Sequence, residues 1–130
     1  MRRLHFWLGV SGIVAFLLTG QYMDKVYDHL EGLPNDVRML FRSSHIYLLL
    51  VSVANLVLGL HLQRFSDSVK RVLQYIVSAI LLVTPFVLLA GFFAEPHMDD
   101  LMRPYSRTAL YGLFGAGITM IIMEIFGDSD

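Results

Sequence analysis

The chain has 130 residues, of which 55% are hydrophobic and 16% are charged, and its formal net charge is −1. This balance leaves no basic surface of the kind that nucleic acid requires, which argues against nucleic acid as a partner. The sequence contains no cysteine, which excludes disulfides, thiolate nucleophiles, iron–sulfur clusters and zinc sites with sulfur ligands. The high apolar share is typical of a membrane protein.

Four apolar segments dominate the sequence, and each is close to the length of about 20 residues that a helix needs to cross a bilayer. Ionisable side chains are nearly absent from these segments, which cover residues 4–22, 45–62, 72–93 and 105–126. The first run is long and lacks a small-x-small cleavage site, so we expect a retained first helix rather than a signal peptide. Because the connections are mostly short, the sequence predicts a single-domain, all-α, up-down-up-down four-helix membrane bundle.

The connection between the first two spans, residues 23–44, is the only long one. Apolar residues recur in it at helical spacing on both sides of a Gly-Leu-Pro turn around Leu33, so both helices should extend beyond the membrane as a hairpin. Residues equally distant from Leu33 would then lie at one level. This register predicts ion pairs that join Asp24 to Arg42 and Asp28 to Arg38.

Small and polar residues recur at helical spacing within the spans, and such residues usually face the interior of a membrane bundle. The predicted interior stripe of the first span is His5, Gly9, Gly12 and Thr19, and that of the second is His45, Ser52, Asn55 and Gly59. The two stripes should face each other, with Gln21 as an interior partner at the level of His45. His61 should point away, because it lies roughly 160° around the helix from His45.

One alternative to plain helix packing is a haem b site. Two neutral imidazoles at one level on facing helices can hold a haem iron when small residues leave room for the macrocycle. His5 and His61 share a level in the predicted hairpin, and Gly9 and Gly12 are the small residues beside them. The outward direction predicted for His61 argues against this site, and both interpretations remain open at this point.

A second alternative is a metal site at the opposite end of the bundle. His29, His45 and His97 could converge there, close to methionines and to Asp99 and Asp100. Imidazole with thioether suits copper, and imidazole with carboxylate suits zinc or a similar divalent ion. The simpler alternative is that these histidines bond to backbone or carboxylate groups.

Glu124 is the only acid inside a predicted span, which makes it a candidate proton carrier, although a hydrated acid at a helix end is the simpler interpretation. Lysine and arginine are equally numerous at the two ends of the predicted bundle, so the first helix decides its orientation. Arg2 and Arg3 precede that helix and Lys25 alone follows it. We therefore expect both termini in the cytoplasm of a bacterial inner membrane.

Two short segments carry a family resemblance. Residues 3–9, Arg-Leu-His-Phe-Trp-Leu-Gly, resemble the start of first helices in some bacterial membrane proteins, including PepSY-associated and b-type cytochrome-like ones. In the haem-binding members the corresponding histidine can be a ligand, which is what the resemblance implies for His5. Residues 42–47, followed by Asn55 and Gly59, are similar to small proteobacterial inner-membrane proteins, which implies a location rather than an activity.

These observations predict a polytopic inner-membrane protein without catalytic machinery, acting as a structural, assembly or small-ligand-binding component. A homodimer or a larger membrane complex is the expected partner besides the lipid. The first alternative is a redox protein that binds haem b, copper or zinc through the histidines named above. The second is a small proton-coupled transporter that uses Glu124.

Overall fold

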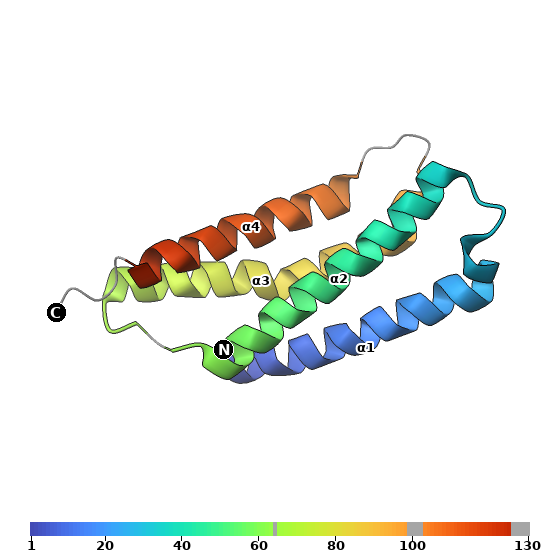
Figure 1. Ribbon diagram of the computed structural model, residues 1–130. Coiled ribbons are helices and arrows are strands. Elements are labelled where there is room, and N and C mark those ends of the chain that lie inside the picture. Colours follow the sequence, from blue (N-terminus) through green and yellow to red (C-terminus); the bar gives the residue numbers. More distant parts are fainter. Residues whose placement is uncertain (64, 99–102, 126–130) are drawn as a thin grey trace.

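The computed structural model describes residues 1–63, 65–98 and 103–125. Four long helices account for most of this part of the chain, and it contains no strand: α1 (Arg2–Val26), α2 (Asn35–His61), α3 (Ser68–Ala94) and α4 (Pro104–Ile125). Two short 3-10 turns follow α1 and α3: η1 (Asp28–Leu30) and η2 (Glu95–His97). The helices run alternately in opposite directions, as Figure 1 shows, so the predicted all-α up-down-up-down bundle is confirmed.

All four helices are long and apolar enough to cross a bilayer. The helix α3 continues through Pro85, which is buried, and Asp67 caps its first turn by accepting a hydrogen bond from the Lys70 amide at 2.9 Å. The start of α1 and the end of α4 lie at the same end of the bundle (Figure 1). We call this the α1-start end, and the opposite end, which carries η1 and η2, the hairpin end.

The helices form two hairpins, α1 with α2 and α3 with α4, joined through the contact of α2 with α3. The main apolar core lies between α2, α3 and α4 and includes Leu48, Val51, Leu81, Leu88 and Leu113. A second apolar cluster at the hairpin end packs Leu30 of η1 against Phe41 and Phe92. Large apolar side chains on the outer faces of α1 and α4 remain exposed, as expected for surfaces in contact with lipid.

Glycines set the close contact between α1 and α2. A Cβ atom at Gly9 would lie 2.6 Å from the backbone nitrogen of Leu56, Gly12 lies against the Ser52 side chain, and Gly59 lies against the Phe6 backbone. The stripe predicted on α1 therefore faces the stripe predicted on α2, in nearly the register that a turn at Leu33 gives. Small residues allow this approach in membrane helices because the two backbones can pack without side chains between them.

The two ion pairs predicted across this hairpin are wrong, since neither forms among the residues that the structure describes. Asp24 instead contacts Nδ1 of His29 at 2.5 Å. The reason is that α1 ends at Val26 and the next backbone turns into the left-handed region, with φ of 45° at Asp28 and 59° at His29. Asp28 thus leaves the helical register on which its pairing with Arg38 depended.

Candidate functional site

Two groups of buried polar side chains are candidates for a functional site, and the first centres on His5 in α1. Its side chain is fully buried, and Nδ1 lies 2.7 Å from Oδ1 of Asn55 in α2. The Asn55 amide nitrogen donates to the carbonyl oxygens of Val51 at 2.9 Å and of Leu81 in α3 at 3.0 Å. One asparagine thereby joins three helices.

This geometry fixes the tautomer of the His5 ring. Because the amide nitrogen of Asn55 makes the two donor bonds, its Oδ1 must face His5 and can only accept a hydrogen bond. The proton of the neutral ring therefore lies on Nδ1, and Nε2 is left with a bare lone pair. Nε2 is buried and has no partner among the described residues, and the same holds for the hydroxyl of Ser78 on α3.

An Asn55→Leu variant is expected to lose about 1–3 kcal/mol of stability, because the His5 Nδ1–H and the Leu81 carbonyl would be buried without partners. Nitrogen-15 NMR of the histidine rings should show His5 protonated on Nδ1 in the wild type and as a mixture of tautomers in the variant. The exposed neighbour Val53 provides a control, since Val53→Leu should change neither quantity. A His5 ring protonated on Nε2 in the wild type would contradict the assignment.

His45 lies on the same helix pair nearer the hairpin end. The Thr19 hydroxyl donates to the carbonyl oxygen of Phe16 at 2.9 Å, so it accepts from Nδ1 of His45, which lies 2.9 Å away. The Phe16 ring stacks on the imidazole with centroids 4.0 Å apart. Gln21, predicted as the interior partner of His45, is exposed, because it lies two residues beyond Thr19 and therefore on the opposite side of α1.

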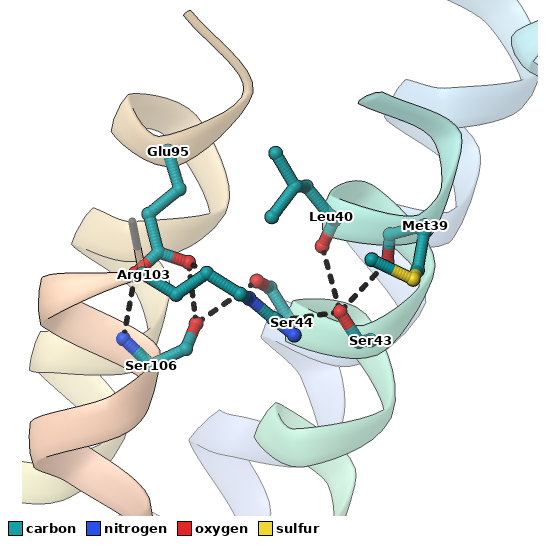
Figure 2. A network of polar contacts seen from close by, with 7 residues as sticks. All are labelled: Met39, Leu40, Ser43, Ser44, Glu95, Arg103 and Ser106. Atoms are coloured by element: carbon teal, nitrogen blue, oxygen red, sulfur yellow. Dashed lines mark hydrogen bonds and ion pairs between the residues drawn. The ribbon is translucent and has the colours of Figure 1, made fainter. Parts of the chain in front are cut away.

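The second group of buried polar residues surrounds Glu95, where η2 leads from α3 toward α4 (Figure 2). Glu95 is fully buried, and both of its carboxyl oxygens accept hydrogen bonds from Ser106. The Ser106 backbone amide lies 2.8 Å from Oε1, and its hydroxyl lies 2.6 Å from Oε2. Ser106 is in the first turn of α4, so Glu95 caps that helix from the end of α3, where the helix dipole favours a negative charge.

Arg103 and two serines of α2 complete this group. Arg103 Nε lies 3.8 Å from Glu95 Oε2, which is within ion-pair range but too long for a hydrogen bond. Nε has no hydrogen-bond partner among the residues that the structure describes. A terminal guanidinium nitrogen of Arg103 instead donates to the Ser43 hydroxyl at 2.5 Å. The Ser44 hydroxyl lies 3.2 Å from that of Ser106. The group, which we call the Glu95 network, therefore connects α2, η2 and α4 (Figure 2).

The residues of the haem alternative are not brought into one site. His5 is buried against Asn55, whereas His61 is exposed in the last turn of α2, as its angle on the helix predicts. The backbone of Leu56 and the side chain of Ser52 occupy the space beside Gly9 and Gly12, where the macrocycle would have needed room.

The residues of the metal alternative are likewise separate. His29 is exposed and paired with Asp24, His97 is exposed on η2, and His45 bonds to Thr19 of α1. Within residues 1–63, 65–98 and 103–125, no three His, Cys, Asp or Glu side chains could hold one metal ion. Asp99 and Asp100, which were predicted to lie near this site, and Met102, one of the methionines predicted there, fall outside the described residues.

The remaining predicted residues have simpler positions. Ser52 is buried and donates to the carbonyl oxygen of Leu48 at 2.5 Å within α2. Glu124 is exposed one residue before the end of α4. No role for Glu95 was predicted from the sequence. An acid at the end of a span, followed by Arg103 and Ser106 at the start of the next helix, is a signal that could have indicated the network.

Comparisons with protein-family models, with curated proteins and with solved structures find no match to this chain. The resemblance of residues 3–9 and 42–47 to bacterial membrane proteins therefore stays a prediction. The function has to be argued from the geometry of the two polar groups and from the outer surfaces of the helices.

Proposed function

We propose that the protein is a polytopic component of a bacterial inner membrane, with both termini in the cytoplasm, and that it acts as a structural or assembly subunit. The observation that carries this proposal is the use of the buried polar groups. Asn55 joins α1, α2 and α3, and the Glu95 network joins α2, η2 and α4. Such bonds fix the relative positions of helices in a membrane, where hydrophobic burial alone does not hold them together.

The outer face of α4 is the surface best suited to a partner within the membrane. Only 17% of the residues in its most apolar stretch are buried within the protein, against 44% for the corresponding stretch of the segment Ser68–His97, which contains α3 and η2. A Cβ atom at Gly117 would meet no atom within 4 Å outside its own stretch of helix, so a second copy of the chain or another membrane helix could approach the α4 backbone there.

Purification in a mild detergent, followed by mass measurement of the native particle, tests this proposal. We expect a particle larger than the monomer, and a Gly117→Leu variant should weaken the assembly by about tenfold, or about 1.4 kcal/mol. The fold should tolerate the change because the space beside Gly117 is open. The exposed Ile118→Leu change on the same helix is the control. A wild-type particle with the mass of a monomer would contradict an assembly role.

One observation favours a redox protein as a second candidate: Nε2 of His5 is buried and has no hydrogen-bond partner in the described part of the chain. A histidine whose Nδ1 donates to an oxygen presents Nε2 in the form that binds a metal. Oxidised and reduced absorption spectra of the same preparation, with a measurement of bound metals, distinguish the two functions. We expect a colourless preparation without stoichiometric metal. A Soret band that disappears in His5→Ala would favour the redox protein instead.

A further inference from the structure

A pocket opens at the α1-start end of the bundle, between the start of α1, the end of α2 and the first turns of α3. Its volume is about 300 Å³, and it is lined by Met1, Arg2, Arg3, Leu62, Gln74 and Tyr75. We propose that this pocket binds the phosphate headgroup of an anionic phospholipid. Its position at the ends of three apolar helices is the level at which lipid headgroups lie.

The charge of the pocket is the first argument for an anionic headgroup. Among the described residues, its lining includes two arginines and no acidic residue. The Arg2 guanidinium is held in place by α2, because Nε donates to the Gly59 carbonyl at 3.2 Å and a terminal nitrogen donates to the Leu60 carbonyl at 2.8 Å. Arg3 is exposed and has no hydrogen bond or ion pair with any described residue, so its donors are available to a ligand.

The backbone at this place adds to the attraction. The helix α1 begins at Arg2, and Met1 gives it no side-chain cap. The amide groups of a first helical turn have no partner within the helix and carry its positive dipole end, which is a favourable environment for a phosphate. Arg3 and the first turn of α1 are therefore both positive toward a ligand in the pocket, and both attract a phosphate.

The rest of the lining fits a phospholipid better than a free anion. Leu62 supplies an apolar wall, and the pocket adjoins the outer face of α3, where Tyr75 and Ile76 are 41% and 54% exposed. Acyl chains could follow this face while the headgroup stays on the arginines. Gln74 donates to the Gln63 carbonyl at 2.6 Å, which ties the wall of the pocket to the connection between α2 and α3.

Further basic residues surround the pocket. Lys70 and Arg71 lie about one turn before Gln74 on α3, and a terminal nitrogen of Arg71 donates to the Ser66 carbonyl at 2.7 Å. Juxtamembrane basic clusters draw anionic lipids, and basic pockets between membrane helices bind their headgroups. A second pocket at the hairpin end also holds two arginines, of which Arg38 is bonded to Asn35, much as Arg2 is bonded to α2 in the first pocket. That pocket supplies a comparison.

Native mass spectrometry of the full chain with added phosphatidylglycerol or phosphatidylcholine tests the proposal. We expect preferential retention of phosphatidylglycerol and about a tenfold loss of this binding in Arg3→Gln. Arg3→Lys, which keeps the charge, should retain most of the binding. Arg3 makes no bond within the described structure, so the fold should survive either change. Arg42→Gln, in the pocket at the hairpin end, is the matched control and should bind as the wild type does.

Three results would overturn the proposal: equal retention of the two lipids, unchanged binding in Arg3→Gln, or an equal loss in Arg42→Gln. In a second experiment, inorganic phosphate is added at millimolar concentration to the complex with phosphatidylglycerol. If the site recognises the lipid, phosphate should leave the bound phosphatidylglycerol in place. Full displacement by inorganic phosphate would identify a site for free anions and would equally overturn the proposal.

Discussion

A Glu95→Ala variant is expected to unfold with a free energy about 3 kcal/mol lower than the wild type. The change removes both acceptors of Ser106, leaves the start of α4 without its cap and takes the counter-charge from Arg103. Breaking a buried ion pair costs about 3–5 kcal/mol, and the lower end applies here because Arg103 is partly exposed and can turn toward water.

Thermal or denaturant unfolding in a mild detergent measures this effect. Glu95→Gln keeps an oxygen for the Ser106 amide, so it should lose clearly less stability than Glu95→Ala. Glu31, which is exposed after η1, provides the control, since Glu31→Ala removes the same charge without a buried partner. Equal stability of the two alanine variants would show that the Glu95 network does not hold the helices.

A Gly59→Leu variant is expected to separate α1 from α2. Its Cβ would overlap backbone atoms of Phe6, and backbone cannot move aside by a change of rotamer. The helix α1 would have to shift, which would also break the bond from Arg2 to the Gly59 carbonyl and strain that between His5 and Asn55. Overpacking costs about 1–3 kcal/mol even where side chains can adjust, so we expect a loss of at least about 3 kcal/mol.

The same unfolding assay checks this prediction, and Gly115→Leu is the matched control. Both changes replace a helical glycine by leucine, but a Cβ at Gly115 meets no atom within 4 Å. Gly115→Leu should therefore be neutral or slightly stabilising, because leucine favours the helix more than glycine does. A similar loss in both variants would mean that contact between α1 and α2 is not the cause.

The interface between α1 and α2 was predictable because the helical period selects the buried face of each helix and the turn at Leu33 sets their register. Every buried residue of α1, His5, Gly9, Gly12 and Thr19, belongs to the stripe that the period selects. The pair of Asp28 with Arg38 failed because it assumed that α1 remains helical beyond Val26, whereas the backbone at Asp28 and His29 turns left-handed. Asp24 lies within α1 but contacts His29 of that turn instead of Arg42. The burial of Leu30 at the end of that turn is a tertiary effect that periodicity does not contain.

The Glu95 network was not predictable by the same means. Its residues come from α2, η2 and the start of α4, and no single helical face contains them. From the sequence, Glu95 is expected to be a polar residue of a loop. Its burial depends on the packing of α3 beside α4, which the sequence pattern does not contain. Gln21 shows the reverse case, a polar side chain within a span that the packing of α1 on α2 leaves exposed.

The position of Glu95 also has a consequence for biosynthesis. The carboxyl group belongs to the end of α3, but its hydrogen-bond donors belong to α4, which the ribosome completes later. Until α4 forms, the growing chain carries this acid at the end of its third helix without the two Ser106 donors that cap it. A chain that stalls or is cut before residue 106 therefore lacks both groups that cap this acid.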